Sequence, residues 1–263
     1  MDLSKAKYIL PNLFTLSSVA ASFYAMLLVS KADSPKEMIA AIWLIGLSMI
    51  MDGCDGRVAR ATRTQSEFGV QLDSLADAIA FGIAPAFIAY KWALEPLGGL
   101  GFFVAFVFVA CGIMRLARFN VLAAKETGPS NHFVGLPIPL AAGTLMAIVM
   151  AHVTMTGQMQ TLTHGAAITV ILVLSGLMVS SVRYRAFKKI RIRGKSGLAL
   201  LALLACVVVT SVQTNTGLAF AGVLSAYILL GLTESAIGLG RRRKGLAEVA
   251  VIEAPEDLSK IVD

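Results

Sequence analysis

Four aspartates lie close together in the chain, between stretches that are apolar enough to cross a bilayer. Asp52 and Asp55 are spaced i, i+3, and Asp73 and Asp77 are spaced i, i+4, so on helices each pair shares one face. Carboxylates at membrane depth are energetically unfavourable and usually functional. Hard oxygen ligands gathered in this way suit Mg²⁺ or Mn²⁺, and Mg²⁺ commonly shares its coordination shell with substrate phosphates. The spacing therefore predicts a metal site made by these four carboxylates, with chemistry on a phosphate.

The composition places the aspartates in a membrane protein. The 263-residue chain is 57% hydrophobic and 15% charged, and its mean hydropathy is +0.76. These values exclude an ordinary soluble domain. The three cysteines, Cys54, Cys111 and Cys206, show no paired spacing and are interpreted as packing residues. We expect the lipid bilayer as a partner and no nucleic acid.

Eight apolar segments have the length needed to cross the hydrocarbon core. Their approximate limits are 12–30, 37–54, 71–92, 98–118, 135–156, 164–183, 197–213 and 217–239. If both termini are cytoplasmic, every Lys and Arg except Lys31, Lys36 and Lys91 lies on the inner side, which agrees with the positive-inside bias. The sequence thus predicts an all-α polytopic membrane helix bundle with about eight transmembrane helices. Both termini and the aspartates would lie at the cytoplasmic face of the cell membrane.

The predicted organisation has three parts. Residues 1–183 form a six-helix core, residues 184–240 hold a basic loop and two further transmembrane helices, and residues 241–263 form a cytoplasmic tail. The last two spans are the weakest, because segment 197–213 is short. A six-span core with a looser C-terminal pair fits the hydropathy nearly as well.

The aspartates also belong to a longer pattern. The chain fits D-x2-D-G-x2-A-R-x8-G-x3-D-x3-D at Asp52, Asp55, Gly56, Ala59, Arg60, Gly69, Asp73 and Asp77. This pattern resembles the signature of the CDP-alcohol phosphatidyltransferases, integral membrane enzymes that move a phosphatidyl or similar group from a CDP-linked donor to an alcohol. The resemblance implies that Asp52, Asp55 and Asp73 hold Mg²⁺ or Mn²⁺. It also implies that Asp77 contacts the ion and acts as the general base toward the acceptor hydroxyl.

The same resemblance implies a set of contacts to CDP-diacylglycerol, namely Asn12, Thr15, Gly56, Ala59, Arg60, Ser66 and Gly69. A glycine lets a nucleotide approach the backbone closely, and the planar guanidinium of Arg60 suits a pyrophosphate. Other readings stay open for several of these residues. Ala59 and Gly69 suit helix packing equally well, and Asn12 and Ser66 suit helix capping.

Sequence beyond the aspartates narrows the resemblance. The strings DSLADAIAFGIAPA, RLARFNV and FVGLPIPLAAG resemble the bacterial and archaeal phosphatidylserine synthases within this family. That resemblance implies an L-serine acceptor, phosphatidylserine and CMP as products, and a homodimer. The predicted serine contacts are Arg115 and Arg118 for the carboxylate, with Asn120, Asn131 and His132 as polar partners. The two arginines also fit a purely topological role under the positive-inside rule.

Two other functions remain open from the sequence. One is a sister enzyme that uses glycerol 3-phosphate or an inositol phosphate, for which Arg115 and Arg118 would bind the acceptor phosphate. The other is a cation- or proton-coupled transporter with the aspartates as its ion site. A transporter is expected to show broken helices or repeat symmetry near the midplane, whereas here the acids lie toward one face beside basic residues. Catalysis is therefore favoured.

Overall fold

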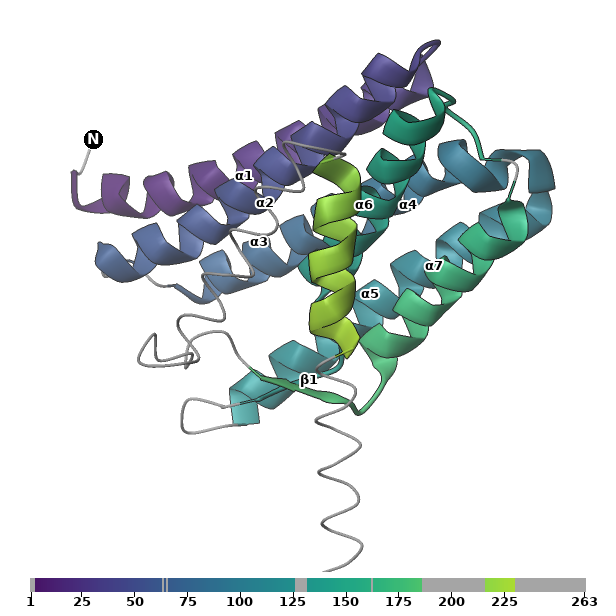
Figure 1. Ribbon diagram of the computed structural model, residues 1–263. Helices are drawn as coiled ribbons and strands as arrows, with labels where there is room; N and C mark the ends of the chain where they lie inside the picture. The colour runs from purple at the N-terminus through teal and green to yellow at the C-terminus, as the bar shows by residue number, and fades with distance from the viewer. Residues whose placement is uncertain are drawn as a thin grey trace, which may run out of the picture.

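The protein is a bundle of long, apolar helices (Figure 1). The computed structural model describes residues 3–62, 64, 66–125, 132–161, 163–185 and 216–229. Its principal helices are α1 (Leu3–Ser30), α2 (Pro35–Ala61), α3 (Glu67–Asp77), α4 (Ala84–Ala89), α5 (Gly99–Lys125), α6 (Ile138–Thr156) and α7 (His164–Val179). A further helix covers Thr216–Leu229.

The third span combines several kinds of helical turn. Helix α3 continues through the π-helical segment η1 (Ala78–Ile83), α4, a second π-helical segment η2 (Tyr90–Leu94) and the 3₁₀ turn η3 (Glu95–Leu97). The first π-helical segment therefore starts directly after Asp77. Such segments are rare and frequently lie at functional sites.

Five of the described helical segments are long and apolar enough to cross a membrane. They cover Leu10–Ser30, Pro35–Ala61, Glu67–Leu97, Gly99–Ala123 and Ile138–Thr156, and α7 and Thr216–Leu229 are shorter apolar helices. The chain is an integral membrane protein. The first six predicted spans each fall on one of these helices, the seventh lies outside the described residues, and the eighth overlaps Thr216–Leu229.

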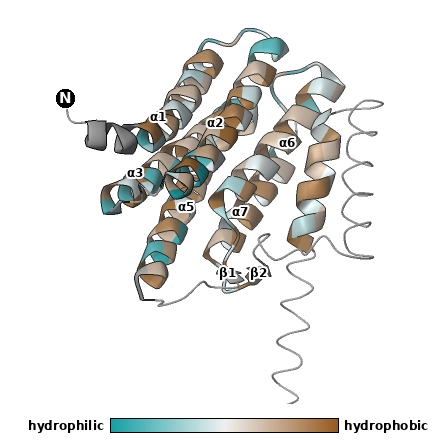
Figure 2. Cartoon of the chain, turned by 90° about the vertical axis from the view of Figure 1, so that its left-hand side faces the viewer, coloured by the Kyte–Doolittle hydropathy of each residue, from teal (hydrophilic) through white to brown (hydrophobic). Residues whose placement is uncertain are grey.

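Hydrophobic side chains cover the outside of the bundle as well as its centre. Phe68, Phe102 and Phe106 are each more than half exposed, and Figure 2 shows hydrophobic residues along most of the helices. Large exposed apolar areas are unusual in soluble monomers. In a bilayer these side chains contact lipid.

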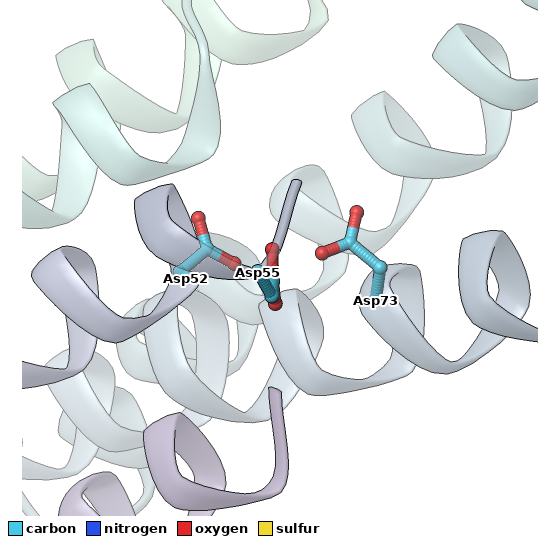
Figure 3. A group of neighbouring side chains, drawn as sticks. All are labelled: Asp52, Asp55 and Asp73. Atoms are coloured by element: carbon cyan, nitrogen blue, oxygen red, sulfur yellow. The ribbon is translucent and has the colours of Figure 1, made fainter. Parts of the chain in front are cut away.

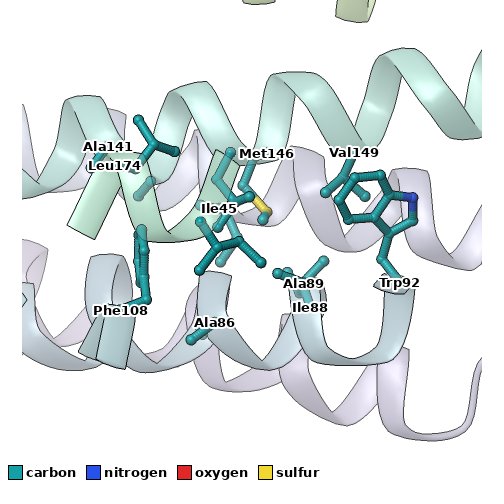
Figure 4. Close-up of a cluster of buried hydrophobic side chains, with 14 of the residues drawn as sticks. Ile45, Ala86, Ile88, Ala89, Trp92, Phe108, Ala141, Met146, Val149 and Leu174 are labelled. Carbon is teal, nitrogen blue, oxygen red and sulfur yellow. The ribbon is translucent and has the colours of Figure 1, made fainter. Parts of the chain in front are cut away.

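The third span and α6 form the centre of the bundle. Ile88 and Trp92 from the third span pack with Ile45 of α2, Phe108 of α5 and Met146 of α6 (Figure 4). Each of these side chains is at most 4% exposed. This core fixes α2, the third span and α5 relative to one another, and these helices carry the aspartates and arginines discussed below.

A short antiparallel ribbon closes one end of α5 and α7. Strand β1 (His132–Val134) pairs with β2 (Arg183–Arg185), with Phe133 opposite Tyr184. Gly135 follows β1 with φ +80°, and a Cβ there would lie 2.3 Å from the carbonyl oxygen of Met178. The sequence predicted helices only, and the ribbon is too short to change that fold class.

Candidate functional site

Two helix ends bring three carboxylates together. Asp52 and Asp55 lie in the last turns of α2, and Asp73 lies on α3. One ligand oxygen from each of the three lies within 4.8 Å of the others. Figure 3 shows Asp55 between Asp52 and Asp73. This donor set is all oxygen and anionic, which suits a hard divalent cation.

The turn between α2 and α3 explains this arrangement. Helix α2 ends at Ala61, and the backbone N–H of Thr64 donates to the carbonyl of Ala59 at 2.9 Å. Ser66 then caps α3, its hydroxyl accepting from the N–H of Gly69 at 3.0 Å. Because the connection is so short, the last turns of α2 and the first turns of α3 are neighbours. The capping role considered for Ser66 is therefore present in the structure.

Asp77 is the last residue of α3. Its carboxyl faces that of Asp52, and its Oδ1 is buried with no hydrogen-bond partner among the described residues. A buried, unpaired carboxylate oxygen beside other carboxylates is strongly unfavourable unless a cation or a donor compensates it. This oxygen therefore fits a site that holds a divalent cation and a hydroxyl-bearing substrate.

A pocket of about 480 Å³, within the range typical of ligand sites, opens beside the carboxylates. Asp55 and Asp73 form part of its wall, and all seven residues predicted to contact the donor line it: Asn12, Thr15, Gly56, Ala59, Arg60, Ser66 and Gly69. Pro11, Thr64, Glu67 and Val70 complete the lining. The sequence predictions did not include these four residues, and the position of a hydroxyl in the turn between the aspartate pairs is the signal that could have pointed to Thr64. Whether each residue contacts a nucleotide stays a prediction.

Several lining residues have defined neighbours. The hydroxyl of Thr15 donates to Oδ2 of Asp55 at 2.6 Å. A Cβ at Gly69 would crowd Ser66 Oγ at 3.2 Å, while Asn12 Oδ1 of α1 would lie at an ordinary contact distance of 3.8 Å. The Arg60 side chain is exposed at the pocket and returns toward Gly56.

Arg115 lies on α5 and is not among the described residues that line this pocket. It is only 7% exposed, it interacts electrostatically with Asp77, and its guanidinium lies 5.2 Å from the centre of the Phe119 ring. Its Nε has no hydrogen-bond partner among the described residues. Nearby on α5, Asn120 donates to the hydroxyl of Ser74 at 2.9 Å, which joins α5 to the helix that carries Asp73 and Asp77.

Arg118 has a different environment from the one that the sequence suggested. Its guanidinium donates to the backbone carbonyls of Val179 at 2.9 Å, Val134 at 3.1 Å and Ser180 at 2.9 Å. Both terminal nitrogens thus hold the ribbon end against α7, which argues against a contact with serine. Asn131 and the side chain of His132 lie outside the described residues.

Comparison with known proteins identifies the family. A sequence profile described as CDP-alcohol phosphatidyltransferase matches residues 8–174, which span the pocket, all four aspartates and Arg115. The chain belongs to the CDP-alcohol phosphatidyltransferase family.

Relatives of the chain within this family carry similar names. A protein of Helicobacter pylori strain 26695, named CDP-diacylglycerol–serine O-phosphatidyltransferase, is 38% identical over 228 residues, covering 86% of this chain and 90% of the relative. An archaetidylserine synthase of Methanothermobacter thermautotrophicus is 38% identical, covering 66% of this chain and 69% of the relative. A CDP-diacylglycerol–serine O-phosphatidyltransferase of Methanocaldococcus jannaschii is 39% identical over 54% of this chain and 61% of the relative.

Proposed function

We propose that this CDP-alcohol phosphatidyltransferase transfers the phosphatidyl group of CDP-diacylglycerol to the hydroxyl of L-serine, releasing CMP. The observation that carries the proposal is the position of the carboxylates between two different environments. One is a pocket lined by the family signature, and the other is a buried arginine beside Asp77. The names of the relatives from Helicobacter pylori and the two archaea support serine as the acceptor.

The pocket is proposed to hold the CDP part of the donor. Arg60 would bind the pyrophosphate through its planar guanidinium, and Gly56 and Gly69 would allow close approach of the nucleotide to the backbone. Asn12, Thr15, Ala59 and Ser66 complete the wall. The acyl chains would remain in the bilayer.

Asp52, Asp55 and Asp73, with Asp77 as a further ligand, are proposed to hold Mg²⁺ or Mn²⁺. When bound, such a cation would offset the negative charge of the carboxylates and of the donor phosphates. The mutual proximity of three of these carboxylates and the unpaired oxygen of Asp77 support this assignment.

Asp77 is proposed as the general base. It would take the proton of the serine hydroxyl while that oxygen forms a bond to the phosphorus that carries diacylglycerol, and the bond from this phosphorus to the CMP oxygen breaks. Arg115 would bind the serine carboxylate, with Asn120 supplying a polar contact to the ammonium group. Among the described residues Arg115 is the one cation assigned to the acceptor, and a single cation suits a zwitterionic acceptor better than a phosphorylated one, which would need further basic groups.

The membrane orientation, the domain organisation and the oligomeric state are proposed to be those predicted from the sequence. The active site would lie at the cytoplasmic face of the cell membrane, residues 1–183 would form the catalytic core, residues 184–240 would follow as an additional unit, and residues 241–263 would form a tail. A Cβ at Gly143 of α6 would lie 3.5 Å from Leu224 Cδ1, which supports packing of the described helix Thr216–Leu229 on α6. A homodimer is part of the proposal, and Gly176 and Gly222, which are exposed, are available to a partner.

The decisive test is CMP release by purified protein in detergent with CDP-diacylglycerol and Mn²⁺ or Mg²⁺. L-serine, glycerol 3-phosphate and an inositol phosphate should be compared as acceptors. The proposal predicts serine-dependent release that EDTA stops and added Mn²⁺ or Mg²⁺ restores. Release only with another alcohol would keep the family and overturn the acceptor. The family membership argues against a transporter, and that hypothesis returns only if no acceptor supports release.

A further inference from the structure

A line of buried hydroxyl groups joins α1 to α2 inside the membrane-spanning region. Ser48 Oγ of α2 lies 2.7 Å from Ser18 Oγ and 2.8 Å from Ser22 Oγ of α1. All three side chains are at most 1% exposed. Interhelical hydrogen bonds of this kind stabilise contacts between membrane helices.

Thr15 continues this line toward the carboxylates. It is 4% exposed and donates to Oδ2 of Asp55, which is 6% exposed. Thr15 lies two helical turns from Ser22 on α1, and Asp55 lies two turns from Ser48 on α2. Both interhelical contacts therefore belong to one antiparallel register.

We propose that Thr15 is a positioning residue for Asp55, and that the serines Ser18, Ser22 and Ser48 fix the register that brings the two together. The inference rests on the proposed function insofar as Asp55 is taken to hold the metal. It deepens that proposal, because Thr15 then acts through a ligand besides lining the pocket.

The physical basis is the orientation of the carboxylate. A hydrogen bond to Oδ2 restricts rotation of the Asp55 side chain, one of whose oxygens lies within 4.8 Å of carboxylate oxygens of Asp52 and Asp73. Partners that orient metal ligands typically contribute about 10- to 100-fold in metal affinity. A slip of α1 by one residue would move the Thr15 hydroxyl by about 1.5 Å along the axis and rotate it away from α2.

Other hydroxyls in the chain provide matched controls. Thr169 of α7 donates to the carbonyl of Gly165 at 2.9 Å, and the buried Ser175 donates to that of Ile171 at 2.7 Å. Both bonds stay within one helix. Substitutions there remove the same chemical group without touching the α1–α2 contact.

The first experiment measures Mn²⁺ binding to purified full-length protein, without substrate, from the electron paramagnetic resonance signal of free Mn²⁺. Thr15→Val should weaken binding about 10-fold or more, whereas Thr15→Ser, which keeps the hydroxyl, and Thr169→Val should bind as the wild type does. Thermal unfolding of each variant in detergent checks that it is folded. Wild-type affinity in folded Thr15→Val would overturn the inference.

A double-mutant cycle tests the register. Ser48→Ala should weaken Mn²⁺ binding less than Thr15→Val does, and it should have no further effect in the Thr15→Val background, because both changes act through Asp55. Ser175→Ala should leave binding unchanged. Independent, additive effects of Ser48→Ala and Thr15→Val would overturn the role of the serines.

Asp55→Asn separates this inference from the proposed function. If the wild type binds Mn²⁺ and Asp55→Asn does not, the metal assignment stands, and the Thr15 variants decide the inference alone. If Asp55→Asn binds as the wild type does, both the metal assignment of Asp55 and the positioning role of Thr15 are overturned.

Discussion

The two sides of the carboxylate cluster are built in different ways. The pocket side is made by α1 and by the ends of α2 and α3 that a short turn connects, and it carries glycines and the exposed Arg60. The other side needs α5, which is distant in sequence, and its Arg115 is 7% exposed. The pocket is thus specified largely by a contiguous motif, whereas the Arg115 side depends on tertiary packing. If the proposed function is correct, this difference would let members of the family share a donor site while the acceptor site varies.

Asp77→Asn should have the largest effect. Removal of the proposed general base is expected to lower kcat by about 10²- to 10⁴-fold, since the amide cannot accept the serine proton. CMP release under saturating serine and CDP-diacylglycerol measures this. Asp33→Asn, in the exposed connection between α1 and α2, is the matched control. Activity of Asp77→Asn within a few-fold of the control would remove Asp77 from the chemistry.

Arg115→Lys should have the second-largest effect, which should fall on the KM for serine. A charge-assisted hydrogen bond contributes about 1.5–3 kcal/mol, so loss of the forked contact should raise the KM for serine roughly 10- to 100-fold. The KM for CDP-diacylglycerol should not change. Arg57→Lys, at an exposed position on α2, controls for the substitution itself. An equal rise in both KM values would show that Arg115 does not belong to an acceptor side.

Arg60→Lys should affect the KM of the donor and not that of the acceptor, and the effect should be smaller than that of Arg115→Lys. Lysine keeps the charge but loses the planar fork, and the exposed position weakens each contact through solvent screening. The KM for CDP-diacylglycerol should rise several-fold while the KM for serine stays constant. A rise in the serine KM instead would place the acceptor in the pocket.

Gly69→Ala should have the smallest effect. Its new methyl group would lie 3.2 Å from Ser66 Oγ, whereas a methyl group at Gly53 would meet nothing within 4 Å. We expect a modest rise in the donor KM for Gly69→Ala, and for Gly53→Ala unchanged kinetics with a stability gain of about 0.5–1 kcal/mol. Steady-state kinetics and thermal unfolding compare the two variants, and equal behaviour would mean that the Ser66 side chain moves to accommodate the methyl group.

The comparison also separates what the sequence predicts from what it cannot. Helical period and apolar length predict the helix bundle and its first six spans, and the spacing of Asp52, Asp55 and Asp73 predicts their convergence. These features are local, or depend on one short turn. The number of spans and the cytoplasmic termini stay predictions, because they depend on segments outside the described residues.

Contacts between residues that are distant in the chain could not be predicted from the sequence. Arg118 meets carbonyls of Val134, Val179 and Ser180, which lie far along the chain and carry no side-chain signal. The β1–β2 ribbon has strands of three residues, too short for a recognisable alternation. The Thr15–Asp55 bond depends on the register between α1 and α2, which periodicity does not determine.

The most direct test of the two-sided account is equilibrium binding of CMP, in the presence of Mn²⁺, to the wild type, Arg60→Lys and Arg115→Lys, measured by isothermal titration calorimetry. The account predicts weaker CMP binding for Arg60→Lys and wild-type binding for Arg115→Lys. Weakening by Arg115→Lys to the same extent as by Arg60→Lys would contradict the separation of donor and acceptor across the carboxylates.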